Sequence, residues 1–131
     1  MKKVFLGGTC NGTDWRERLK LYLAIDYFDP VVKDWTEECQ VEEIRQRELC
    51  DFCLYVITPE MTGVYSIAEV IDDSNKRPGK TIFCILGGER KDDRFHYHLL
   101  NSLIQVGKMV ERNGGKYFTS LIDVAKYLNN N

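Results

Sequence analysis

The feature that most constrains the fold is the apolar run "DFCLYVIT" at residues 51–58. Its apolar side chains follow one another almost without interruption, instead of alternating with polar ones. Such a run is typical of a central strand in a parallel sheet, which is covered on both faces. A second run, "KTIFCIL" at residues 80–86, has the same character. Two such strands need helices on both sides of their sheet, which predicts a three-layer α/β sandwich.

The remaining elements alternate along the chain. Further strands are predicted at residues 2–6, 25–30 and, more weakly, 108–113 ("KMVERN"). Helices are predicted at 14–23, 36–50, from Ser66 to about Lys76, 93–105 and 119–130. This alternation predicts a parallel sheet of about five strands with right-handed crossovers. Because no repeat or linker interrupts the 131 residues, we interpret 1–131 as one domain.

Composition and charge exclude several kinds of partner. The net charge is -2 and the pI is about 5.7, whereas domains that bind nucleic-acid polymers are usually basic. Only a three-residue apolar run precedes the first glycines, so neither an export signal nor a membrane partner is expected. Five cysteines without such a signal indicate reduced thiols and a cytoplasmic protein. The pair Cys50 and Cys53 joins a helix end to a strand, which favours packing over redox chemistry, and no metal-ligand pattern is present.

In sheets of this kind, ligands bind beyond the carboxyl ends of the strands, at the topological switch point. The loop "GGTCNGTDW" at residues 7–15 follows the first strand and is rich in glycine and hydroxyl groups, which suits an anion or a ribose. The alternative is a tight turn followed by a helix cap. Trp15 and Trp35 follow the first and second strands, where each could stack on a base or pack in the core.

The stretch "GVYSIAEV" at residues 63–70 allows two interpretations of Glu69. In the first, Ser66 caps a helix and Glu69, three residues later, completes a capping box. In the second, Glu69 faces the ligand crevice and shares a helix face with Tyr65 and Asp73. A carboxylate so placed can attack an electrophilic sugar carbon.

With these loops in order, the chain resembles the nucleoside 2-deoxyribosyltransferase-like family over roughly residues 2–86. The motifs that carry the resemblance are "VFLGG", the "DW" at residues 34–35, the acidic helix after it, "CDFCLYVIT" and "GVYSIAEV". The resemblance implies a flavodoxin-like or Rossmann-like sandwich. It also implies that a glutamate at the start of the helix after the third strand, residues 51–58, is the nucleophile, and Glu69 stands at that position.

The resemblance extends to further site residues. Glu43 lies eight residues after Trp35 and corresponds to an acidic residue that handles base or sugar, where the transferases usually carry aspartate. Contacts to base and sugar are implied for Gly7, Gly8, Thr9, Trp15, Trp35, Gly63, Tyr65 and Ser66. This chain departs from the enzymes at Gly63, where they have aspartate, and at Phe5, where they have tyrosine. Its tail "NNN" has no counterpart of the segment that closes a neighbouring subunit's site.

We therefore expect cleavage or transfer at the N-glycosidic bond of a nucleoside or nucleotide, with Glu69 and Glu43 as catalytic groups. No metal or organic cofactor is required, and a homo-oligomer is expected from the resemblance. The alternative is a non-catalytic nucleotide-binding or sensing module of the same fold. An FMN carrier is a third reading, because the loop at 7–15 faintly resembles a flavodoxin phosphate loop.

Overall fold

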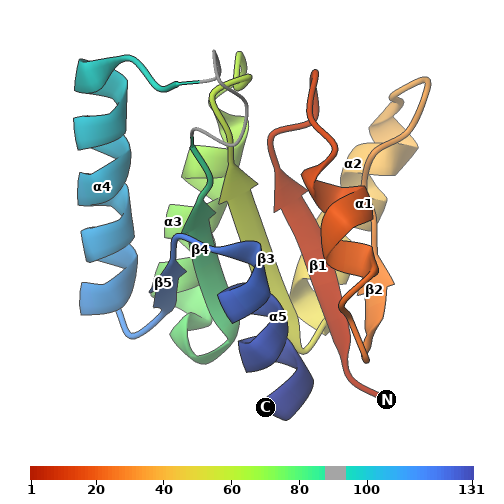
Figure 1. The fold of residues 1–131 in the computed structure, drawn as a ribbon. Helices are drawn as coiled ribbons and strands as arrows, with labels where there is room; N and C mark the ends of the chain where they lie inside the picture. Colours follow the sequence, from red (N-terminus) through yellow and green to blue (C-terminus); the bar gives the residue numbers. More distant parts are fainter. Residues whose placement is uncertain (88–93) are drawn as a thin grey trace.

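The computed structural model describes residues 1–87 and 94–131. Five parallel strands form one sheet in the order β2-β1-β3-β4-β5 (Figure 1). The strands are β1 (Lys3–Gly8), β2 (Asp26–Phe28), β3 (Phe52–Ile57), β4 (Thr81–Ile85) and β5 (Lys116–Phe118). The predicted parallel sheet is confirmed, and the chain reverses its winding direction between β1 and β3, which makes that edge the switch point.

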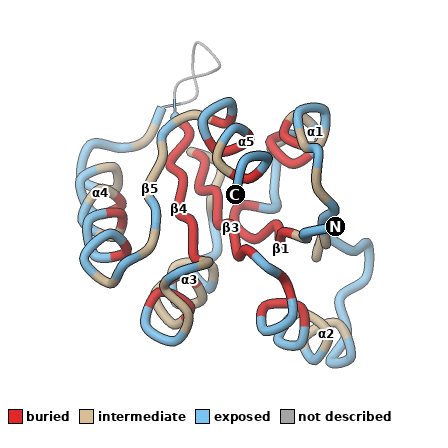
Figure 2. The backbone as a smooth tube through the Cα atoms, turned by 90° about the horizontal axis from the view of Figure 1, so that it is seen from below, coloured by how far each residue is buried: buried red, intermediate tan, exposed pale blue. Residues whose placement is uncertain are grey.

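Helices cover both faces of the sheet, as the apolar strands require (Figures 1 and 2). The helices α1 (Trp15–Lys20) and α5 (Leu121–Asn130) pack on one face, and α2 (Glu37–Leu49), α3 (Tyr65–Lys76) and α4 (Tyr97–Arg112) on the other. A short 3₁₀ turn, η1 (Pro78–Lys80), precedes β4. The three-layer sandwich is thus confirmed.

Strand β3 is the centre of both hydrophobic cores. All six of its residues are buried. Leu54 and Val56 face the core under α1 and α5, whereas Tyr55 and Ile57 face the core under α2, α3 and α4. Side chains that alternate between two apolar layers explain why the strand reads as one uninterrupted apolar run.

The strand predicted at residues 108–113 is wrong, because these residues belong to α4 and its C-cap. Leu103, Val106 and Val110 recur at helical spacing and pack on the core below α3 and α4. The helix ends where Gly114 adopts a φ of +104°, and β5 follows directly. The apolar residues of "KMVERN" are therefore the buried side of a helix, and the edge strand lies a few residues further on.

The predicted helix at 14–23 is also shorter than expected, since α1 ends at Lys20. At Thr36 the predicted cap of the acidic helix is confirmed, because its side chain accepts a hydrogen bond from the Cys39 amide. In the described part of the chain, no helix combines the length and apolar character that a membrane span needs.

Candidate active site

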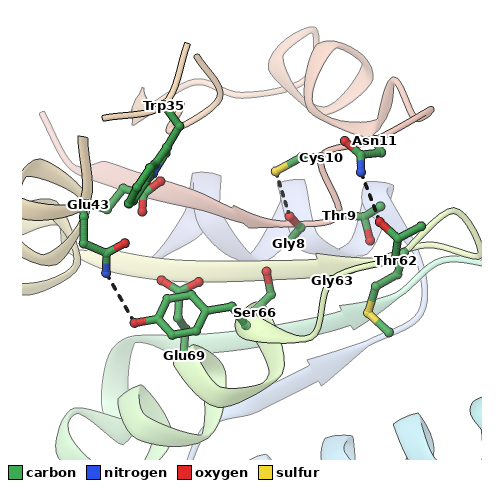
Figure 3. Close-up of a pocket in the computed structure, with 13 residues that line it drawn as sticks. Gly8, Thr9, Cys10, Asn11, Trp35, Glu43, Thr62, Gly63, Ser66 and Glu69 are labelled. Carbon is green, nitrogen blue, oxygen red and sulfur yellow. Dashed lines mark hydrogen bonds between the residues drawn. The ribbon is translucent and has the colours of Figure 1, made fainter. Parts of the chain in front are cut away.

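A pocket with a cavity volume of about 400 Å³ lies at the carboxyl ends of β1 and β3, at the switch point. This size lies within the range usual for small-ligand sites. Trp35 and Glu43 line the pocket on the side of α2, and the end of β1 lines the opposite side. Glu69 and Ser66 lie between these two sides (Figure 3). The lining residues are Gly8, Thr9, Cys10, Asn11, Trp35, Gln40, Glu43, Met61, Thr62, Gly63, Tyr65, Ser66 and Glu69.

The end of β1 is shaped by close backbone packing. Gly8 has a φ of +116°, and a Cβ atom at this position would lie 2.0 Å from the Val56 carbonyl oxygen. Only glycine therefore fits here, both for the conformation and for the space. Thr9 continues the contact with β3, because its amide donates to Val56 and its hydroxyl accepts from the Thr58 amide at 3.0 Å. The first wall of the pocket is thus held firmly against β3.

The same loop is held from behind by Trp15 and Arg16. The indole nitrogen of Trp15 donates to the Thr9 carbonyl at 2.9 Å. The buried Arg16 guanidinium donates to the carbonyls of Leu6, Gly8 and Thr9 at 3.0, 3.2 and 2.6 Å. These bonds fix the backbone from the end of β1 into the loop, and Trp15 itself is fully buried in the core beneath it.

The capping-box interpretation of Glu69 is wrong. Helix α3 begins at Tyr65, its N-cap is Val64, and no side chain caps it. Ser66 is already the second helical residue, so Glu69 lies in the second turn, beyond the free amides of the helix start. The position of Glu69 is therefore explained by its neighbours across the pocket and not by helix capping.

Glu69 is a desolvated carboxyl group beside a fixed cation. Its side chain is only 11% exposed, and Oε2 lies 3.8 Å from Nη1 of Arg47 on α2. Burial raises the pKa of Glu69 to about 7, while the Arg47 charge pulls it down and the charges of Glu43 and Asp73 push it up. The group can therefore change its charge near neutral pH, as residues of catalytic sites commonly do.

Glu43 supplies the second carboxyl group of the pocket. It is half-buried on α2, and burial raises its pKa, opposed by the charge of Arg47. One helical turn earlier, Gln40 donates a 3.4 Å hydrogen bond to the Tyr65 hydroxyl, which ties α2 to the start of α3. Two carboxyl groups in different environments are the equipment that glycosidic chemistry needs, with one ionised while the other carries a proton.

Behind the pocket, Arg47 belongs to a buried charge cluster with the fully buried Asp73. Arg47 donates to both Asp73 oxygens, at 3.2 Å from Nε and 2.9 Å from Nη2, and Nη2 also lies 3.0 Å from Asp72. Asp73 additionally accepts from Tyr55 and from Arg77. Burial and the Asp73 charge raise the pKa of Tyr55, so its hydroxyl stays a donor.

The structure brings eight of the ten predicted site residues into this pocket. They are Gly8, Thr9, Trp35, Glu43, Gly63, Tyr65, Ser66 and Glu69. Gly7 and Trp15 do not line it: Gly7 packs against the Tyr55 ring, and Trp15 is core. Because parallel strands end at one edge of the sheet, the sequence also predicts ligand contacts from the loop "GGERKDD" at residues 87–93, but residues 88–93 lie outside the described part of the chain.

Sequence reasoning missed the two arginines that hold the site, Arg16 and Arg47. For Arg47 a signal was present, because Glu43 and Arg47 are four residues apart on α2, and Glu69 and Asp73 are four apart on α3. Two such pairs on facing helices indicate an ion-pair network. For Arg16 there was no such spacing, since its partners are backbone carbonyls, the Cys10 sulfur and Asp29, and none of them lies on a helix.

Cys10 offers a direct test of the pocket. It lines the cavity and is exposed, whereas Cys50, Cys53 and Cys84 are buried and burial raises the pKa of Cys53 to about 12. We expect iodoacetamide to alkylate Cys10 much faster than the buried thiols, because the thiolate is the reactive form. A nucleoside in the pocket should slow this step, as followed by peptide mass spectrometry. Equal labelling of Cys10 with and without ligand would place the ligand elsewhere.

The fold and the pocket together define an α/β protein with a cavity at its switch point, lined by two carboxyl groups and an exposed indole. The family model described as nucleoside 2-deoxyribosyltransferase like matches residues 1–88, and the chain belongs to this family. The match includes β1 to β4 and all lining residues of the pocket. Neither the curated proteins nor the solved structures that were searched contain a match.

Proposed function

We propose that this protein cleaves or transfers the N-glycosidic bond of a nucleoside or nucleotide, with Glu69 as the nucleophile. The observation that carries the proposal is the place of Glu69: a buried carboxyl group, in a pocket at the switch point, beside Arg47 and facing a second carboxyl group. Family membership supports the substrate class. No metal cluster occurs among the described residues, and the proposed chemistry requires none.

In the first step, a carboxylate oxygen of Glu69 attacks the anomeric carbon of the sugar. The bond from this carbon to the base nitrogen breaks, its electron pair leaves with the base, and the Glu43 carboxyl group gives its proton to the base. In the second step, water or another base attacks the same carbon, Glu69 leaves as carboxylate, and Glu43 takes the proton of the attacking group. Burial raises the pKa of Glu43, which is the direction that a general acid requires.

Trp35 is the proposed stacking surface for the base. Its ring lines the pocket and is 58% exposed, so its removal should cost the fold little. We expect Trp35→Ala to weaken nucleoside binding by about 1–3 kcal/mol, the usual contribution of one aromatic stack on a base. Calorimetric titration in a Glu69→Gln background measures this without turnover. Trp35→Phe keeps a ring and should retain most of the affinity. If the background protein and both Trp35 variants bind the nucleoside equally well, Trp35 does not contact the base.

The reaction itself is tested by a product assay. Wild-type protein and Glu69→Ala are incubated with a panel of nucleosides and 5'-nucleotides, and free base is followed by chromatography. We expect base release by the wild type alone, and parallel reactions with and without an acceptor base distinguish transfer from hydrolysis. Base release by both proteins would show that Glu69 is not the nucleophile.

The alternative function is a non-catalytic nucleotide-binding or sensing module. Two residues favour this alternative. Gly63 lacks the carboxyl group, and Phe5 lacks the hydroxyl group, that the resemblance implies at these positions. This function predicts ligand protection of Cys10 without any base release. A homo-oligomer and a cytoplasmic location remain part of the proposal, and five cysteines that form no disulfide in the described residues fit a reducing compartment.

A further inference from the structure

We propose that Arg47 is the positioning residue of the nucleophile, which favours the carboxylate form of Glu69 and aims it at the sugar. This inference rests on the proposed function and assigns a role to a residue outside the pocket lining. Its basis is geometric. Arg47 lies on α2 and its side chain is 7% exposed, and one end of its guanidinium faces Glu69 while the rest faces Asp72 and Asp73 further along α3.

The guanidinium cannot rotate freely, because its other nitrogens are already bonded. Nε and Nη2 donate to the two oxygens of Asp73, a two-point contact that fixes the plane of the group. Nη2 also donates to Asp72 at 3.0 Å. Nη1 is the nitrogen directed at Glu69, at 3.8 Å from Oε2. Asp73 is itself held by Tyr55 and Arg77, so the orientation extends back to β3.

Three charged groups act on Glu69 from the elements packed around it. Arg47 and Glu43 act from α2, and Asp73 acts from its own helix. Glu43 and Asp73 both oppose ionisation of Glu69, as does burial, whereas Arg47 favours it. Without Arg47 the carboxyl group would retain its proton to higher pH and would be a poor nucleophile at neutrality.

The arrangement also suits the reaction cycle. With Oε2 held toward Arg47, the second oxygen of Glu69 is left to form the bond to the sugar. Once Glu69 is esterified it carries no charge, but Arg47 still has Asp72 and Asp73 as partners. The guanidinium therefore stays compensated in both states, and an isolated buried charge never arises. An arginine paired with Glu69 alone would lose its partner at each turnover.

The chain offers a matched control for this role, because Arg77 also binds Asp73 but has no contact with Glu69 that the structure records. We compare Arg47→Gln with Arg77→Gln, which remove the same charge from two sides of the same carboxylate. The Glu69 carboxyl carbon is followed by ¹³C NMR as pH is varied, and its signal is assigned by its loss in Glu69→Gln. This readout requires no turnover.

We expect the Glu69 titration midpoint to rise by about one pH unit in Arg47→Gln, a tenfold gain in proton affinity, and to move much less in Arg77→Gln. If Arg47→Gln does not fold, Arg47→Lys replaces it. Lysine keeps the charge, but its single ammonium group cannot contact Asp73 and Glu69 together as the planar guanidinium does. The Glu69 titration midpoint should therefore rise in this variant as well. An unchanged midpoint in the folded variant, or an equal rise in Arg77→Gln, would overturn the role of Arg47.

A second readout links the role to catalysis. In the wild type, base release at limiting substrate should increase as pH rises through about 7, where Glu69 ionises. The pH at which base release reaches half of its maximum should rise together with the NMR midpoint in the Arg47 variant. It should stay unchanged in Arg77→Gln. If no substrate is turned over, the proposed function fails while the NMR result still decides whether Arg47 controls the charge of Glu69.

Discussion

Glu69→Gln is expected to lose base release by at least about a thousandfold, since removal of a catalytic nucleophile eliminates the covalent step. The same change should make the protein more stable at pH 8. Both effects have one cause, because the ionised Glu69 carboxylate, the form that would attack the sugar, is a charge in a desolvated place. Glutamine has nearly the same shape and no charge to desolvate.

The direction of the stability change follows from proton linkage. The pKa of Glu69 is raised from 4.5 to about 7 in the folded protein, so between these values the folded state binds more protons than the unfolded state. Stability contributed by Glu69 is therefore complete below pH 4.5 and is lost as pH rises through 7. We expect Glu69→Gln to exceed the wild type by about 2 kcal/mol at pH 8 and to lose this advantage toward pH 4.5.

Urea unfolding at pH 8 and at pH 5 measures the stability, and chromatography of free base measures the rate. Glu48→Gln is a suitable control, because Glu48 is an exposed glutamate on α2 that does not line the pocket. It should change neither quantity. A Glu69→Gln protein that is less stable than the wild type at pH 8 would contradict the desolvated state of the carboxylate.

Asp73→Ala is expected to destabilise the fold by about 3–5 kcal/mol, the usual cost of removing one partner from a buried ion pair. Asp73 is fully buried and accepts from Arg47, Arg77 and Tyr55. Alanine would leave two guanidinium groups and a buried hydroxyl without their shared acceptor, and the buried Arg47 and Tyr55 cannot reach bulk water without rearrangement. Urea unfolding at pH 7 measures the loss.

The neighbouring Asp72 provides the contrast. It also pairs with Arg47, but its side chain is 40% exposed and its other partner is the exposed Lys76. Asp72→Ala should therefore cost far less than Asp73→Ala, because water replaces the lost carboxylate. Equal losses in the two variants would mean that burial does not set the strength of this cluster.

A comparison of sequence and structure shows which features are local. The apolar run of β3 predicts a strand covered on both faces, and the structure places its alternate side chains in two cores. "KMVERN" shows the limit of such patterns, because a short apolar segment has the same composition on the inner side of a helix as in an edge strand. The end of α4 at Gly114 depends on a backbone conformation that composition does not reveal.

The candidate site divides in the same way. Loops at the ends of β1 and β3 are predicted by the strand order, because parallel strands bring their carboxyl ends to one edge. The two Trp residues look alike in the sequence, yet Trp15 is buried against Thr9 and Trp35 is exposed in the pocket. Their fates differ because α1 packs on the sheet, whereas Trp35 precedes α2 in a loop beside the cavity.

By itself the sequence determined the α/β sandwich and the edge of the sheet where a ligand is expected, because strand character and order along the chain are local properties. It also marked two carboxyl groups to examine, Glu69 by its place after the third strand and Glu43 through the family resemblance alone. Only the tertiary structure decided that Glu69 is no helix cap and that its carboxyl group lies beside Arg47. Those facts depend on which groups meet across α2, α3 and β3 and on the water excluded between them, and no spacing along one segment records either.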